Sequence, residues 1–305
     1  MHKARVQMAE LLPKVDLVIE ILDARIPYSS ENPMLEELRG NKPCLKIMNK
    51  SDLADEELTA TWKAHFEKRH SVRARAVTTS EPSQIRRIAD DCLKMFPDKQ
   101  GIGKHVTAMI CGIPNVGKST LINILAGRKV AKTGNEPAVT KGQQRINLQN
   151  GVRLFDTPGV LWPNLANENG GYRLATIGSI KDTAMEYEDV AVFAIKHLLN
   201  KYPNRLMERY KLEETPAAPL EALDAIGKKR GCLNKRAIVD YERVSKILLT
   251  ELRAGKLGRL TLETPEMAER EKVEVAAKLQ EREETKAKKK SERKAKFKEK
   301  QRRRR

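Results

Sequence analysis

The chain has 305 residues and a formal net charge of +18, with 33% charged and 40% apolar residues. This length permits one large domain or two ordinary domains with buried cores, and the low apolar fraction predicts that part of the chain lies outside any core. No apolar run approaches the roughly 18 residues that cross a bilayer, so we expect no membrane-spanning helix.

The positive charge is concentrated near the C-terminus. Residues 286–305 contain 13 Lys or Arg and two Glu, a net charge of +11, which leaves +7 for the first 285 residues. A basic segment of this kind predicts binding to a polyanion, most simply nucleic acid. A solvated segment that only improves solubility is the alternative.

The four cysteines are scattered along the chain, without the paired spacing of a disulfide framework or a zinc site. This usage favours a reducing compartment. The N-terminus begins with an amphipathic helical pattern instead of a secretory signal. We therefore expect a cytoplasmic protein.

Residues 1–165 alternate between strand and helix patterns. The predicted strands are 15–22, 43–48, 72–77, 105–111, 143–148 and 152–155, and the predicted helices are 33–38, 56–68, 84–96 and a segment ending near 126. Such alternation predicts an α/β fold with a mostly parallel sheet that is covered on both faces.

After about residue 161 the pattern becomes helical throughout. Helical periodicity covers 172–180, 188–201, 204–210, 219–227 and 235–253, so we expect a smaller all-helical domain over 172–262 that ends at Pro265. Residues 266–305 are highly charged and nearly devoid of aromatic residues. We expect them to form a basic tail, either a solvated single helix or a segment that is disordered without a partner.

The clearest motif is a phosphate-binding loop, Gly112-Ile113-Pro114-Asn115-Val116-Gly117-Lys118-Ser119-Thr120, between a predicted strand and a predicted helix. The two glycines let the backbone turn its N–H groups of residues 115–120 toward an anion, and the helix N-terminus adds partial positive charge. Lys118 is expected to neutralise the β- and γ-phosphates, and Ser119 to bind Mg²⁺. A glycine-containing turn that matches by chance is the alternative.

Two further segments fit around the phosphates. Asp156-Thr157-Pro158-Gly159 ends a predicted strand, where Asp156 can hold Mg²⁺ through water and the Gly159 N–H can reach a γ-phosphate. Thr140 lies in the loop between the helix and the next strand, where a threonine can close onto Mg²⁺ once a γ-phosphate is present. We therefore expect Lys118, Thr140 and Gly159 to act in catalysis.

Asn49-Lys50-Ser51-Asp52 at the end of a predicted strand indicates which base is bound. Asp52 can accept two hydrogen bonds from guanine, whereas adenine would leave that carboxylate unpaired. The Lys50 stem can lie over the base and Asn49 can tie this loop to the phosphate loop. Thr78 and Thr79, after the next strand, are expected to contact the base as well.

The order of these motifs is unusual, because the guanine motif precedes the phosphate loop and Asp156-Thr157-Pro158-Gly159. This order predicts a P-loop GTPase domain with circular permutation, which keeps spatial neighbours unchanged if the original termini were close. In this arrangement the γ-phosphate-sensing segment after Gly159 leads directly into the helical domain. Its movement can therefore be passed on without a separate linker.

The chain resembles the YlqF/RbgA family of bacterial ribosome-biogenesis GTPases. The resemblance covers about residues 1–260 and rests on Asp23-Ala24-Arg25-Ile26-Pro27, the guanine motif, the phosphate loop and the segment from Asp156 to Pro163. It implies GTP hydrolysis that is slow alone and is stimulated by ribosomal particles, in late maturation of the large subunit.

The resemblance also bears on individual positions. Val160 and Leu161 stand where many GTPases have a water-orienting Gln, which suits this family. Family members usually have a Gly-His pair just ahead of the match, and His2 does not align with it, so no role is carried over to His2. Asn115 can help to coordinate K⁺ beside the phosphates, and the alternative is that it only shapes the loop.

We therefore expect a monomeric GTPase that uses GTP/GDP and Mg²⁺, binds large-subunit rRNA and proteins through its helical domain and basic tail, and is released on hydrolysis. Two alternatives remain. One is a GTPase that acts on another RNA, such as the small subunit or tRNA. The other is an RNA-binding assembly scaffold whose GTP site is structural.

Overall fold

The computed structural model describes residues 2–101, 103–131, 144–148, 150–157, 167–180 and 185–302. Strands alternate with helices up to residue 156. From residue 168 onward the described elements are helices. In addition, Leu233 and Val239 form one isolated antiparallel β-bridge among the described residues.

The described strands form one sheet in the order β3-β2-β1-β4-β6-β5. Their bounds are β1 (Leu17–Asp23), β2 (Cys44–Asn49), β3 (Val72–Ala76), β4 (Val106–Gly112), β5 (Gln144–Asn147) and β6 (Val152–Asp156). Neighbouring strands are parallel except β5, which is antiparallel to β6. The predicted α/β class with a mostly parallel sheet is therefore confirmed.

Among the described residues of this half of the chain are five helices and three short 3₁₀ segments. They are α1 (His2–Leu11), α2 (Pro33–Arg39), α3 (Glu56–Glu67), α4 (Pro82–Lys94), α5 (Lys118–Ala126), η1 (Leu12–Lys14), η2 (Ser51–Leu53) and η3 (Pro97–Lys99).

The central strand β1 is buried along its whole length because both faces of the sheet are covered. Leu17, Ile19 and Ile21 belong to a hydrophobic cluster on the face of α4 and α5. Val18 and Leu22 belong to a second cluster, which contains side chains of α1, α2 and α3. The alternation follows from the two-residue period of a strand.

The second half of the chain is helical, as predicted. Its helices are α6 (Glu168–Thr176), α7 (Tyr187–Lys201), α8 (Pro203–Tyr210), α9 (Pro219–Lys229), α10 (Tyr241–Arg253) and α11 (Pro265–Arg302). Helices α7, α9 and α10 pack against one another, and α6 and α8 both pack against α7.

One predicted helix starts too early, because the pattern over 235–253 becomes helical only at Tyr241. The Asn234 side chain accepts hydrogen bonds from the backbone N–H groups of Arg236 and Ile238, and this stabilises a turn. Asp240 then caps α10 by accepting from Arg243 N. Local side-chain hydrogen bonding thus outweighs helical periodicity here.

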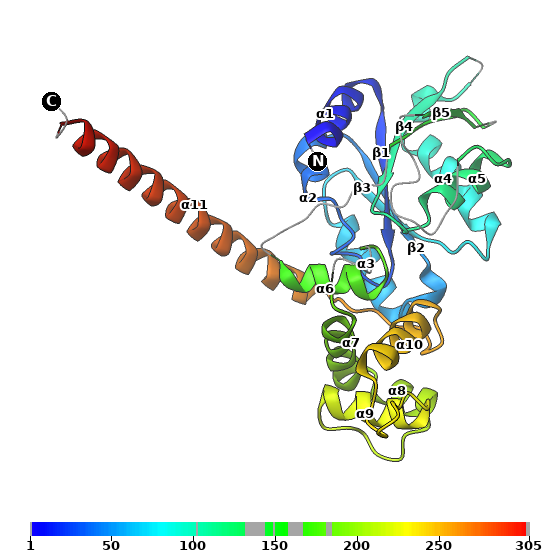
Figure 1. Cartoon of the computed structure of the whole chain (residues 1–305). Helices are drawn as coiled ribbons and strands as arrows, with labels where there is room; N and C mark the ends of the chain where they lie inside the picture. The colour runs from blue at the N-terminus through cyan, green and yellow to red at the C-terminus, as the bar shows by residue number, and fades with distance from the viewer. Residues whose placement is uncertain are drawn as a thin grey trace.

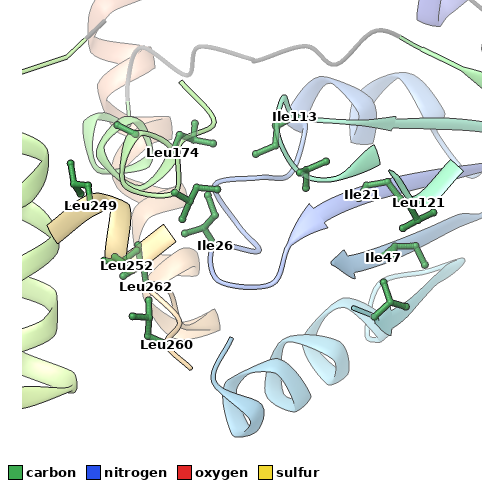
Figure 2. Packing of buried hydrophobic residues seen from close by; sticks show 14 of the residues in the cluster. Ile21, Ile26, Ile47, Ile113, Leu121, Leu174, Leu249, Leu252, Leu260 and Leu262 are labelled. Carbon is green, nitrogen blue, oxygen red and sulfur yellow. The ribbon is translucent and has the colours of Figure 1, made fainter. Parts of the chain in front are cut away.

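The two halves share one hydrophobic cluster. Figure 2 shows Ile21, Ile26 and Ile113 of the first half together with Leu174 and Leu252 of the second. The segment after α10 returns to the first half, where Leu260 N donates to Leu53 O at 3.0 Å and Leu262 N donates to Arg25 O at 2.8 Å.

The charged C-terminal segment forms one long helix in the described residues, and it extends away from the body (Figure 1). Pro265, which we expected to end the helical domain, is the first residue of α11. At this position the missing N–H of proline costs no helical hydrogen bond. Ala268 is fully buried in the second cluster. No helix among the described residues is long and apolar enough to cross a membrane.

The tryptophan of α3 gives a test of this arrangement. Trp62 is fully buried, and its Nε1–H donates to Glu263 O at 3.1 Å. We expect Trp62→Ala to lower the free energy of unfolding by about 3–5 kcal/mol, because it leaves a cavity between α3 and the returning segment. Urea denaturation followed by circular dichroism would measure it.

Leu220→Ala is the control, because Leu220 is 58% exposed. It should change the free energy of unfolding by less than about 0.5 kcal/mol. Equal effects of the two substitutions would contradict the described packing of α3.

Candidate functional site

The phosphate loop, residues 112–120, runs from the end of β4 into α5. A Cβ on Gly112 would lie 2.7 Å from Ile21 O, so a larger residue would push against the backbone of β1. Gly117 has a φ of +93°, which favours glycine, and a Cβ there would lie 2.4 Å from Asn49 Nδ2. The loop therefore needs both glycines for close packing.

The 49–52 loop lies directly against the phosphate loop. Asn49 Nδ2 donates to Val116 O at 2.7 Å, and Lys50 Nζ donates to Asn115 O at 2.8 Å. Lys50 has a φ of 60°, a left-handed conformation that ends β2 and lets η2 begin. The structure thus brings together two motifs that are far apart in the sequence.

Asp52 and Ser51 lie in the η2 turn at the end of β2. Ser51 N donates to Val77 O at 3.1 Å, which holds the turn beside the segment after β3. Asp52 is exposed, and so is Thr79, whereas Thr78 is buried. Thr78 Oγ1 accepts from Ser80 N at 3.2 Å, so Thr78 shapes its own loop.

The end of β6 adds an acidic group beside the phosphate loop. Lys118 Nζ forms an ion pair with Asp156 Oδ1, and both side chains are buried. Asp156 Oδ2 is buried and has no hydrogen-bond partner within the described part of the chain. Burial raises the pKa of Asp156, although Lys118 opposes this shift.

The other predicted phosphate-loop residues follow from the start of α5. Lys118 is its first residue, and Ser119 and Thr120 continue the first turn, with Ser119 partly buried and Thr120 exposed. The predicted residues Thr140 and Gly159 lie outside the described residues.

Asn115 links the phosphate loop to the helical half. Its φ is 60°, and its Nδ2 donates to Gly178 O at 2.8 Å, just after α6. Arg253 at the end of α10 reaches the same place, because its Nε donates to Thr176 O at 3.0 Å and its Nη2 to Ala175 O at 2.7 Å. The helical half therefore contacts the phosphate loop directly.

Asp23 is the last residue of β1 and lies near this site. The sequence motifs predicted no role for it. It is fully buried, and its Oδ2 lies 3.0 Å from Lys50 Nζ. The available signal was an acidic residue at the end of a mostly apolar strand, which also contains Glu20. That signal alone does not tell which lysine the carboxylate meets.

Comparison with known proteins gives a consistent result. A family model described as a 50S ribosome-binding GTPase matches residues 107–228. The chain is 45% identical over 288 residues to ribosome biogenesis GTPase A of Bacillus cereus, covering 92% of this chain and 97% of that protein. It is 32% identical to ribosome biogenesis GTPase A of Thermotoga maritima, covering 87% and 92%.

A solved structure supports the same relationship. The GNP-bound YlqF from T. maritima matches with a TM-score of 0.63 and 30% identity, over 87% of this chain and 99% of that chain. The agreement in sequence, in length and in the order of motifs along the sheet leads to one conclusion. The chain belongs to the ribosome biogenesis GTPase A (YlqF/RbgA) family of circularly permuted GTPases.

Proposed function

We propose that this protein hydrolyses GTP as an assembly factor for the large (50S) ribosomal subunit. The observation that carries the proposal is the contact of Asn49 and Lys50 with the carbonyl oxygens of Val116 and Asn115, beside the Lys118–Asp156 pair. A loop suited to guanine and a loop suited to phosphates thus form one site. Family membership supports the reaction and its ribosomal context.

In the proposed site, the backbone N–H groups of residues 115–120 and the start of α5 hold the phosphates. An incoming γ-phosphate competes with Asp156 for the Lys118 ammonium. Asp156, whose Oδ2 has no hydrogen-bond partner in the described part of the chain, would then hold a cation together with Ser119. When bound there, Mg²⁺ would neutralise phosphate charge, and Thr140 and Gly159 are proposed to complete this side.

Base recognition is proposed for Asp52, supported by Lys50, Asn49, Ser51, Thr78 and Thr79. The exposure of Asp52 leaves its carboxylate accessible to the guanine edge. K⁺ is a further proposed ligand at Asn115. A cation would bind the amide oxygen, which carries the available lone pairs, while the amide nitrogen donates to Gly178 O.

The proposed coupling to the ribosome uses three parts of the chain: the GTPase domain (1–165), the helical domain (172–262) and the basic tail (266–305). Residues 158–166 lead directly into α6, whose Arg173 pairs with Glu271 of α11 at 2.5 Å. Asn167 Nδ2 also donates to Glu271 at 3.0 Å. Movement after Gly159 would therefore reach the tail helix through these contacts.

We further propose that the protein acts as a cytoplasmic monomer and that its helical domain and tail contact rRNA and proteins of the large subunit. Hydrolysis is expected to be slow without the particle, because Val160 and Leu161 cannot orient water. A particle that accelerates it roughly 10⁵-fold would lower the barrier by about 7 kcal/mol.

The lysine of the phosphate loop gives the first test. Lys118→Ala should reduce kcat for GTP at least about a hundred-fold, because it removes the cation that stabilises developing phosphate charge. Phosphate release under saturating GTP would measure it. Lys129→Ala, an exposed lysine just after α5, is the control and should be unchanged.

Substitution of Asp52 tests base selection. Asp52→Asn should reduce the preference for GTP over ATP by about a hundred-fold or more and should improve XTP binding, because an amide can donate to the xanthine carbonyl. Competition binding with the three nucleotides would measure it, with Glu57→Gln as an exposed acidic control. Intact selectivity in Asp52→Asn would show that the base assignment is wrong.

Ribosomal particles discriminate between the candidate functions. GTP hydrolysis should rise by several orders of magnitude with large subunits and stay near the basal rate with small subunits or tRNA. Stimulation by small subunits or tRNA alone would favour a GTPase for another RNA. No stimulation by any of them would favour a scaffold with a structural GTP site.

A further inference from the structure

Asp23 lies under the proposed base-binding loop without being able to contact a ligand. It faces Asn49 in the parallel register of β1 and β2, and its relative exposure is 0%. Any influence of this carboxylate on a bound nucleotide must therefore pass through the residues that it holds.

Those residues are two cations. Asp23 Oδ1 accepts from Arg25 Nε at 2.9 Å, and Oδ2 accepts from Arg25 Nη2 at 2.9 Å and lies 3.0 Å from Lys50 Nζ. Burial alone would raise the pKa of Asp23, but Arg25 and Lys50 together hold it well below its usual range. The carboxylate is therefore ionised wherever the protein is folded near neutral pH.

Lys50 is held from two sides as a result. Its ammonium lies between Asp23 Oδ2, at the end of β1, and Asn115 O, in the phosphate loop after β4. A lysine without such anchors samples many rotamers, and ordering it on ligand binding costs free energy. With both contacts, the side chain of Lys50 is already ordered between the 49–52 loop and the phosphate loop before a ligand binds.

Arg25 fixes the carboxylate in turn. Arg25 O accepts from Leu262 N at 2.8 Å, and Arg25 Nη1 donates to Arg253 O at 3.4 Å, so the end of α10 and the segment after it hold this arginine in place. The bidentate pairing with Asp23 leaves the carboxylate one orientation, with Oδ2 toward Lys50.

We propose that Asp23 is a positioning residue for guanine nucleotides, which acts by holding Lys50 in its binding conformation and so slows nucleotide release. The proposal rests on the nucleotide site proposed above. It deepens that site by adding a residue that makes no contact with the ligand.

The chain contains a matched control. Glu20 and Lys46 face each other in the same two strands, are 2% and 4% exposed, and form an ion pair at 2.5 Å. This pair lies in the middle of the sheet, away from both loops, and its carboxylate also accepts from Asn32 N at 2.7 Å. Glu20→Gln therefore disturbs a buried acid–lysine pair of β1 and β2 without touching Lys50.

The experiment measures release of ribose-labelled fluorescent GDP from the full chain by stopped flow. Asp23→Asn should accelerate release about ten-fold, since a charge-assisted anchor of Lys50 is lost. Lys50→Ala should accelerate it at least as much. The variant with both substitutions should release GDP no faster than Lys50→Ala, because Asp23 acts through Lys50. Glu20→Gln should leave the release rate unchanged while lowering the urea midpoint.

Three outcomes with the Asp23 and Lys50 variants would overturn the proposal. Additive acceleration by Asp23→Asn and Lys50→Ala would show that Asp23 acts by another route. A normal rate in Asp23→Asn, with fast release in Lys50→Ala, would show that Lys50 needs no anchor. Normal release in Lys50→Ala itself would overturn the site assignment, and with it this inference.

A second pair of variants tests the proposal even if Asp23→Asn alone does not fold. Asp23→Asn leaves Arg25 buried without its carboxylate, which destabilises the fold. Asp23→Asn combined with Arg25→Met removes both buried charges, and Arg25→Met alone is its reference. Release from the double variant should be faster than from Arg25→Met, because Asp23 still pairs with Lys50 in the reference, and equal rates would contradict the proposal.

Discussion

Two hydrogen bonds join the end of β2 and the residue after it to the phosphate loop, and the proposed site is arranged around them. They run from the side chains of Asn49 and Lys50 to the carbonyl oxygens of Val116 and Asn115. The parallel arrangement of β2, β1 and β4 brings the carboxyl ends of these strands to one edge, where the loops meet. This close approach also explains Gly117, since any Cβ there would collide with Asn49.

Buried charged residues lie in ion pairs beside the contact between these two loops. Asp23 with Arg25 and Lys50, and Lys118 with Asp156, place two carboxylates at the ends of strands β1 and β6. Buried ion pairs contribute little to stability unless their hydrogen bonds are complete, so their value here lies in orientation. Both oxygens of Asp23 are paired, whereas Asp156 Oδ2 has no hydrogen-bond partner among the residues that the structure describes.

The helical half packs against the sheet half of the chain and shares its hydrophobic cluster. Its apolar residues belong to the same cluster as one face of the sheet, and Asn115 donates to Gly178 beside the end of α6. The circularly permuted order places the segment after β6 directly before α6, and α6 pairs with the first turns of α11. Short physical contacts therefore join the phosphate loop to the helical half, and the helical half to the first turns of the tail helix.

The amino-acid sequence by itself determined the motifs, their order and the alternation of strands and helices, because these depend on local periodicity and on residue types at fixed spacing. It failed where a local interaction competed with periodicity, as at Asn234 and Asp240 ahead of α10. It also gave no role to Glu271 or Asp23. Only the tertiary structure decided these, since Arg173 and Glu271 are 98 positions apart, and Lys50 reaches Asn115 across 65. Such partners are chosen by how strands and helices pack, which no local pattern encodes.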